Sequence, residues 1–131
     1  MVFGLVSVRS ETVVISEIMY HAPGNKPEYI EIYNNTLTPF DIADWRLRGG
    51  VEYDFPSFTA SNPALTFLKP FERIVLTSAD SATLRAVYNI PSTVRVYGPW
   101  QGHLSDGGER ITLKDKNGVI VCTVEYNDRR H

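Results

Sequence analysis

The sequence predicts an all-β domain, built as a sandwich or a barrel, and three observations support this prediction. Short segments rich in β-branched and aromatic residues recur about every ten residues, and turn-forming residues separate them. No segment approaches the roughly 18 consecutive apolar residues that a membrane-spanning helix requires. The chain has 131 residues, and neither an internal repeat nor a low-complexity tract divides it. A single domain with one core is therefore expected.

Eight segments are predicted to be strands, a number that suits two packed sheets. In chain order they are residues 12–20, 28–34, 44–49, 51–56, 73–77, 94–98, 110–115 and 119–126. The first two strands are expected to form a hairpin, because Gly24 and Asn25 in the connecting loop tolerate positive φ. Between the last two strands, Asn117 and Gly118 predict a tight primed turn.

One short helix is predicted near residues 80–88. Ser78 or Asp80 can cap its free amide groups, and Leu84 and Tyr88 fall at helical spacing. A helix of this length, placed between two predicted strands, is expected to connect them.

The N-terminal segment is treated separately from the domain. The first eight residues, MVFGLVSV, are mostly apolar, but no positive leader comes before them and no clear signal-peptide cleavage site follows. We interpret residues 1–11 as a leading strand or a non-native remnant, and residues 12–131 as the domain.

Charge and cysteine content exclude several classes of function. The chain has 13 Lys and Arg against 15 Asp and Glu, so its formal charge of −2 offers no basic footprint for nucleic acid or anionic lipid. A single cysteine, Cys122, excludes an intrachain disulfide. The two-residue period of its strand places Cys122 with Val124 and Tyr126 on the core face. The alternative, a reactive thiol, needs a nearby base or cation, and the neighbouring sequence supplies none.

Four stretches together resemble the lamin tail domain, and they extend from about residue 13 to residue 126. They are EYIEIYNN (28–35) followed by DIADWRL (41–47), YDFPSFT (53–59) and GPWQGHLSDGGERITLKDKNG (98–118). The resemblance implies an immunoglobulin-like β-sandwich of two mainly antiparallel sheets, in which Trp45 is a buried packing residue.

The same resemblance carries an expectation about function. The sequence is similar above all to bacterial versions of the domain, which implies a non-catalytic interaction or scaffold module of a larger extracytoplasmic or surface-associated protein. This sequence contains no heptad-repeat rod and no prenylation signal, so filament assembly and nuclear-envelope anchoring are not expected.

Glu17 and Glu31 are candidate metal ligands. If the first hairpin pairs symmetrically about its loop, the two residues are directly opposed, and like charges in this position destabilise a sheet. One interpretation is that solvent, a shifted register or a cation such as Arg46, Arg48 or a lysine compensates the repulsion. The other is a Ca²⁺ site, because Ca²⁺ prefers carboxylate oxygens. No other metal or cofactor is expected, since three histidines and one cysteine at these spacings form no tetrahedral set.

Trp100 and His103 are candidate interaction residues on a glycine-bounded loop. Exposed aromatic side chains on loops often anchor proteins or sugar rings, although Trp100 can instead pack over the end of the sandwich. His103, Ser105 and Asp106 lie too close along one loop to converge as a catalytic triad, and no nucleophile elbow is present. No enzymatic activity is expected.

The expected partner is a protein or a cell-surface polymer of unspecified identity. Open sheet edges also allow self-association. The alternative to a scaffold is a carbohydrate-binding or calcium-stabilised adhesion module.

Overall fold

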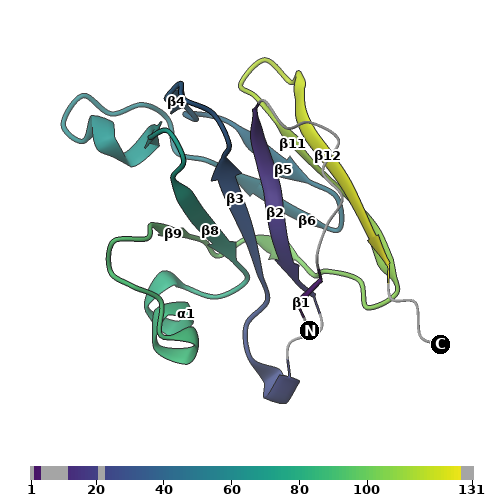
Figure 1. Ribbon diagram of the computed structural model, residues 1–131. Coiled ribbons are helices and arrows are strands. Elements are labelled where there is room, and N and C mark those ends of the chain that lie inside the picture. Colours follow the sequence, from purple (N-terminus) through teal and green to yellow (C-terminus); the bar gives the residue numbers. More distant parts are fainter. Residues whose placement is uncertain (1, 4–11, 21–22, 128–131) are drawn as a thin grey trace.

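The computed structural model describes residues 2–3, 12–20 and 23–127, and in this part of the chain two five-stranded sheets pack face to face (Figure 1). The first sheet contains, in spatial order, β1 (Val2–Phe3), β2 (Val13–Met19), β3 (Tyr29–Asn34), β8 (Arg73–Thr77) and β9 (Val96–Tyr97). The second contains β10 (Gln101–Gly102), β6 (Val51–Asp54), β5 (Arg46–Arg48), β11 (Gly108–Lys114) and β12 (Ile120–Asn127). Within these sheets only β8 and β9 pair in parallel. The all-β prediction and its sandwich alternative are confirmed.

Every predicted strand overlaps an observed one, and the missed strands are all very short. A small third sheet joins β4 (Phe40–Asp41) to β7 (Phe67–Leu68), and β10 also has two residues. Two residues carry no alternation of apolar and polar side chains, so the sequence holds no periodic signal for them. The backbone of β1 pairs with β2, while the rest of the predicted leading segment, residues 1 and 4–11, lies outside the described residues.

The core lies between the two large sheets, and alternate residues of each strand supply it. Its fully buried aliphatic side chains include Ile15, Ile18, Ile30, Ile32, Leu47, Ile74, Leu76, Ile111 and Leu113. Each such side chain contributes about 1.5–3 kcal/mol on leaving water. Trp45 and Cys122 are 6% and 1% exposed, so both belong to this core as predicted.

The predicted helix is present as α1 (Ser81–Tyr88), between β8 and β9 (Figure 1). Asp80 is its N-cap and accepts a hydrogen bond from the amide of Thr83 at 2.9 Å. Leu84 is fully buried, and the ring of Tyr88 lies edge-on to Tyr29 with 5.2 Å between centroids. The helix therefore packs beside the first sheet as a connection between two of its strands.

The first loop follows the prediction where the structure describes it, but the second turn does not. A short 3₁₀ turn, η1 (Pro23–Asn25), contains Gly24 and Asn25 at φ values of 64° and 61°. Residues 21–22 of this loop lie outside the described residues.

The turn between β11 and β12 is not the predicted primed turn. Its i→i+3 hydrogen bond runs from the amide of Gly118 to the carbonyl of Asp115, so the central residues are Lys116 and Asn117. Of these residues only Gly118, with φ of 82°, has a positive φ. The Asp115 carboxylate accepts hydrogen bonds from the amides of Asn117 and Val119 at 2.8 and 3.0 Å. This carboxylate stabilises a longer loop that the two-residue prediction did not include.

Asn34 ends β3 and anchors the irregular segments around it. Its side chain is fully buried, and its amide nitrogen donates to the carbonyls of Thr38 and Lys69, both at 2.9 Å. Its amide oxygen accepts from the backbone amide and the hydroxyl of Thr36 at 3.1 and 2.8 Å. One side chain thus satisfies the backbone of two loops that sit beside β4 and β7.

We expect Asn34→Ala to lower the free energy of unfolding by about 2 kcal/mol, because partly buried carbonyls lose their donor. Urea denaturation measures the change. Asn62→Ala is the matched control: this side chain is exposed and makes no capping hydrogen bond, so its effect should stay within about 0.5 kcal/mol. Equal effects of the two substitutions would contradict the anchoring role.

Candidate binding groove at one end of the sandwich

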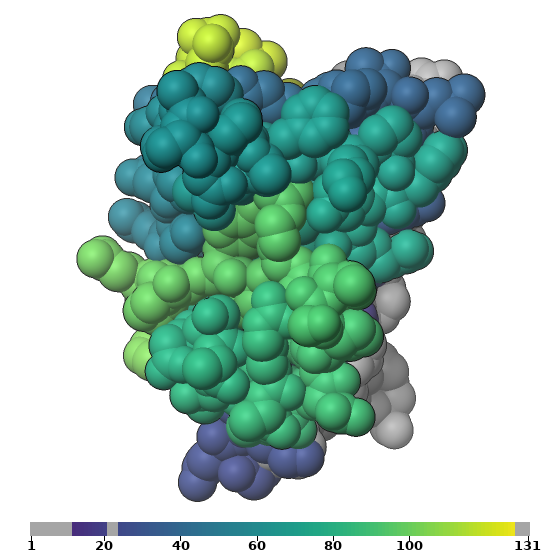
Figure 2. Space-filling view, turned by 90° about the vertical axis from the view of Figure 1, so that its left-hand side faces the viewer, coloured from purple at the N-terminus to yellow at the C-terminus, as the bar shows by residue number. Residues whose placement is uncertain are grey.

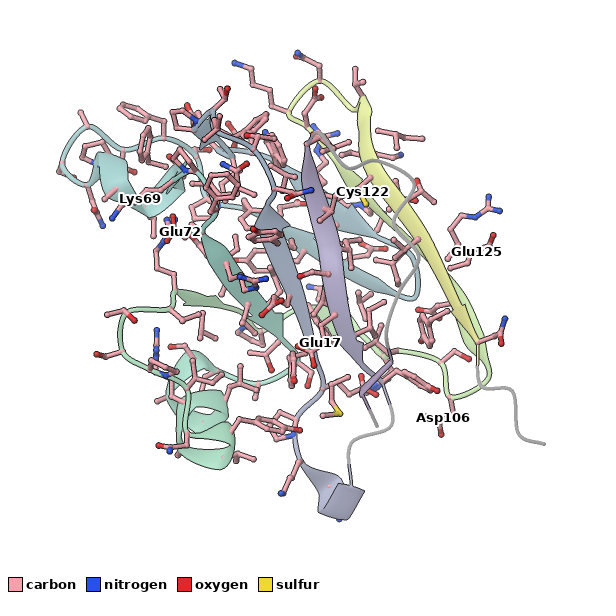
Figure 3. All side chains as sticks on the ribbon, in the orientation of Figure 1. Glu17, Lys69, Glu72, Asp106, Cys122 and Glu125 are labelled. Atoms are coloured by element: carbon pink, nitrogen blue, oxygen red, sulfur yellow. The ribbon has the colours of Figure 1, made fainter. Side chains whose placement is uncertain are left out.

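The two predicted metal ligands lie directly opposite each other. Glu17 on β2 pairs with Glu31 on β3, as the hairpin symmetry predicted, and a bulge between Ile15 and Glu17 precedes this pair. Both side chains are on the outer face of the first sheet, because Ile18, Ile30 and Ile32 next to them point into the core. Figure 3 labels Glu17 on this sheet.

Side chains of the same sheet compensate the opposed carboxylates. Glu31 Oε1 lies 3.3 Å from Arg73 Nε and accepts a hydrogen bond from the Ser16 hydroxyl at 2.7 Å. The Tyr29 hydroxyl donates to Glu17 at 3.3 Å. The cation is Arg73 of β8, so the sequence interpretation named the wrong arginines.

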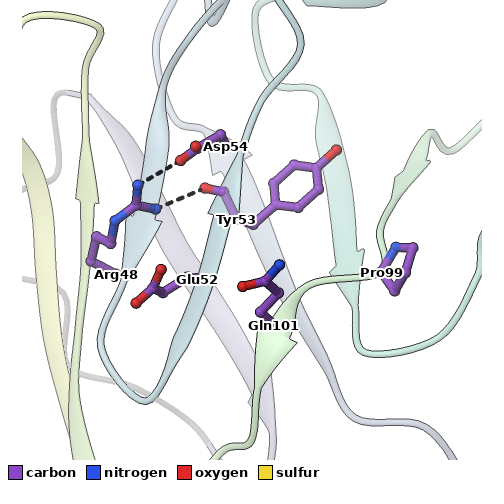
Figure 4. A pocket seen from close by; sticks show the side chains of 6 residues that line it. All are labelled: Arg48, Glu52, Tyr53, Asp54, Pro99 and Gln101. Carbon is purple, nitrogen blue, oxygen red and sulfur yellow. Dashed lines mark hydrogen bonds and ion pairs between the residues drawn. The ribbon is translucent and has the colours of Figure 1, made fainter.

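Those arginines, Arg46 and Arg48, belong to β5 of the other sheet. Arg48 pairs there with Asp54 at 2.6 Å and lines a hollow of about 190 Å³ with Gln101 and Pro99 (Figure 4). The error arose because sequence order does not show which sheet an arginine joins.

Glu17 and Glu28 carry perturbed pKa values. Burial, and then the charge of Glu31, raise the pKa of Glu17 above its ordinary value. Burial is also the main reason that the pKa of Glu28 is raised, although Leu104 donates its backbone amide to this carboxylate at 3.1 Å. The folded protein therefore binds these two protons more tightly than the unfolded chain does.

This linkage predicts that stability rises as the pH falls from about 7 toward the ordinary glutamate value of 4.5. The folded state takes up protons first, so the slope of unfolding free energy against pH is negative in this window. Glu17→Gln should remove part of that slope and stabilise the protein by about 0.5 kcal/mol near neutral pH. Thermal unfolding between pH 4.5 and 7 measures both effects.

Glu125→Gln is the control for this prediction, since Glu125 is exposed and paired with Arg110 at 3.3 Å. If the plots of stability against pH for Glu17→Gln and Glu125→Gln superimpose, the raised pKa of Glu17 is not a source of the pH dependence.

Trp100 and His103, the predicted interaction residues, occupy different environments. Trp100 is 5% exposed and belongs to the core cluster, and its backbone amide donates to the carbonyl of Thr77 at 3.0 Å. This burial fits packing within the domain and leaves no open ring face for stacking on a sugar. His103 is exposed and lines a polar hollow of about 570 Å³ with Lys26, Glu28 and Asp106.

The neighbouring polar residues of the His103 loop maintain local structure. The Ser105 hydroxyl accepts from the amide of Gly107 at 3.1 Å, and the Ser105 carbonyl accepts from the Tyr126 hydroxyl at 2.7 Å. Glu109 accepts from the amide of Gly50 at 3.0 Å. The first of these contacts shapes a turn, and the other two hold the segment to Tyr126 and Gly50.

A groove that sequence reasoning missed lies beside Trp45, at the end of the sandwich opposite to the hollow lined by His103. It consists of two adjoining hollows that share Asp41 and Phe58, and it is called the aromatic groove below. The first hollow, of about 390 Å³, is lined by Thr12, Phe40, Asp41, Ala43, Asp44, Trp45, Phe58, Asp115, Lys116, Asn117 and Val121. The second, of about 330 Å³, is lined by Asp41, Phe58, Pro63, Ala64, Thr66 and Phe67.

Two exposed phenylalanines mark this groove. Phe58 and Phe67 are 56% and 45% exposed, which is unusual for side chains whose burial would be worth about 2–3 kcal/mol each. In Figure 2 the segment around residues 55–67, in teal, projects at the top of the molecule below the yellow tip of the β11–β12 hairpin. The groove is therefore bounded by segments that are distant in sequence.

The floor and wall of the groove are held by hydrogen bonds. The amide of Phe55 donates to the carbonyl of Trp45 at 2.8 Å, and the Ser57 hydroxyl donates to Asp44 at 2.6 Å. The rings of Phe40 and Trp45 lie edge-to-face, with 6.1 Å between centroids. Phe58 thus directly follows a short segment, residues 55–57, that is fixed to Asp44 and Trp45 just before β5.

Arg95 fixes the other wall. Its guanidinium donates to the carbonyls of Ala64, Leu65 and Phe67 at 2.7, 2.9 and 2.7 Å. Glu72 balances the charge of Arg95 at 3.0 Å, and it also accepts from the backbone amide of Lys69 at 2.8 Å (Figure 3). The segment that carries Phe67 is therefore clamped to the first sheet.

The sequence held one signal for this groove that was not used. The stretch YDFPSFT places Phe58 between two turn-forming residues and outside any alternating strand pattern, which is typical of an exposed loop aromatic. Phe67 carried no such signal, because it lies within an apolar run, ALTFL, that reads as a buried segment.

The fold and the aromatic groove together define an immunoglobulin-like β-sandwich of the kind that serves as an interaction module. A model of the Lamin Tail Domain family matches residues 8–128, so the chain belongs to the lamin tail domain family. Among curated proteins none matches the chain. In the described part of the chain, no helix has the length and apolar character needed to cross a membrane.

Proposed function

We propose that this domain is a non-catalytic interaction module of a larger bacterial protein that is extracytoplasmic or attached to the cell surface. Its partner is a protein, and the aromatic groove is the surface that binds it. The observation that carries the proposal is the exposure of Phe58 and Phe67 on walls that hydrogen bonds hold in place.

Physical reasoning supports a binding role for these two rings. Exposed aromatic side chains lose a large apolar area to a partner, and they dominate the binding energy of many interfaces. A groove whose backbone is already ordered loses little further entropy on binding. The anchored segment that carries Phe67 therefore suits recognition better than a mobile loop would.

Site-specific photocrosslinking in the full-length parent protein tests this proposal. We expect p-benzoylphenylalanine at position 67 to form adducts with another protein in intact cells, on the extracytoplasmic side. The same probe at Leu37, which is 83% exposed and does not line the groove, is the matched control. Absence of adducts at position 67, or equal labelling at both positions, would reject the groove as the binding surface.

A calcium-stabilised adhesion module is the second candidate function, and the observed opposition of Glu17 and Glu31 favours it. Thermal unfolding in EDTA and then in graded calcium tests this candidate. At about a hundredfold excess over the dissociation constant, bound calcium adds about 2.7 kcal/mol to stability. Such a gain in the wild type, lost in Glu31→Gln, supports the site. An unchanged unfolding temperature would instead assign compensation of the two charges to Arg73, Ser16 and Tyr29 alone.

A further inference from the structure

We infer that the aromatic groove recognises an apolar peptide segment that carries adjacent lysine or arginine residues. The inference rests on the proposed function and specifies its partner: the aromatic rings provide the contact surface, and the carboxylates around them select for positive charge.

Three carboxylates surround the first hollow. They belong to Asp41, Asp44 and Asp115, and Lys116 is the one cation that lines this hollow among the described residues. No ion pair involves any of the three aspartates within residues 12–20 and 23–127. Among the described residues, the groove therefore carries a local negative charge that no ion pair neutralises.

The hydrogen bonds of these carboxylates hold them in place without neutralising them. Asp41 accepts from the amide of Ala43 at 3.0 Å, and Asp44 accepts from the Ser57 hydroxyl at 2.6 Å. Asp115 accepts from two amides of its own turn. In each case these hydrogen bonds use one carboxylate oxygen, Oδ1, so the Oδ2 atom remains for a guanidinium or an ammonium group.

The second hollow differs in chemistry from the first. Pro63, Ala64, Phe58 and Phe67 form most of its wall, and Asp41 is its one ionisable residue. Asp41 and Phe58 line both hollows. A peptide whose apolar side chain lies in the second hollow therefore places a basic side chain from the next residue beside Asp41. An apolar residue next to a basic one along a peptide meets this requirement.

The same composition argues against a sugar or a second copy of this chain. A sugar ring needs several hydrogen-bond donors and acceptors, and the second hollow offers few polar side chains. A second copy brings the same acidic groove and a net charge of −2, so like charges would face each other if the grooves met. A basic and apolar segment of another protein is the occupant that fits both charge and shape.

Selection of random dodecapeptides displayed on phage, carried out on the wild-type protein, tests the inference. We expect enriched peptides to combine an aromatic or aliphatic residue with at least one adjacent arginine or lysine. The best peptide is then synthesised, together with a version in which each basic residue is replaced by glutamine. Calorimetry should show weaker binding of that version by about tenfold or more, and weaker binding of the original as salt concentration rises.

Matched variants separate the contributions of charge and apolar contact. Asp41→Asn keeps the acceptor for Ala43 but removes a charge, and it should weaken binding about tenfold. Lys116→Glu, in the same hollow, should strengthen it. Phe58→Ser should abolish binding, whereas Glu52→Gln on the outer face of the second sheet should have no effect. Unfolding curves confirm that each variant is folded.

The outcomes distinguish this inference from the proposed function. Enrichment of apolar peptides without basic residues, or binding that Asp41→Asn and Lys116→Glu leave unchanged, overturns the inference. Two further results would overturn it: binding to a glycan array that Phe58→Ser abolishes, or a dimer in sedimentation experiments that the same substitution abolishes. If no peptide is enriched while position 67 still crosslinks to a protein in cells, the inference fails and the proposed function stands.

Discussion

The shape of the groove end depends on the guanidinium of Arg95. The segment before β8 consists of a short 3₁₀ turn, η2 (Pro63–Thr66), the two-residue strand β7 and a loop, so several of its carbonyls need hydrogen-bond donors from elsewhere. Arg95 has five N–H donors in a planar group, and it binds the carbonyls of Ala64, Leu65 and Phe67 together. A lysine has one nitrogen and cannot reach the same set of acceptors in a fixed geometry. Glu72 and the Tyr97 hydroxyl complete this network, because both also contact Arg95.

This clamp joins a rigid frame to an irregular recognition surface. The frame is the sandwich, whose core excludes water between two sheets and positions Trp45 under the groove. The surface combines loops, which tolerate exposed aromatic residues such as Phe58, with the two-residue strand β7, which presents Phe67. Binding at such a surface requires little rearrangement of the backbone. Rigidity at the groove therefore depends on the hydrogen bonds that hold its walls.

Charge in this protein is organised locally, and the net value hides that organisation. A formal charge of −2 suggests a nearly neutral surface, yet Asp41, Asp44 and Asp115 gather at one end. On the outer face of the first sheet, Glu17 and Glu31 are also adjacent, but Arg73 pairs with Glu31 there. The two acidic regions thus differ in whether an ion pair compensates their negative charge. The groove carboxylates form no ion pair within the described residues, which is why that end of the molecule, rather than the sheet face, suits a basic partner.

The sequence by itself determined the strands, the helix cap at Asp80, the burial of Cys122 and the opposition of Glu17 to Glu31, because each follows from local periodicity or from one hairpin. The predicted turn at Asn117 and Gly118 was wrong in detail. The Asp115 side chain accepts hydrogen bonds from backbone amides of the loop, and a pattern of residue types does not reveal these bonds. Only the tertiary structure decided that Arg73 compensates Glu31 and that Phe58 meets the β11–β12 turn in one groove. Those contacts join residues from separate strands and loops, and their proximity depends on how the two sheets pack.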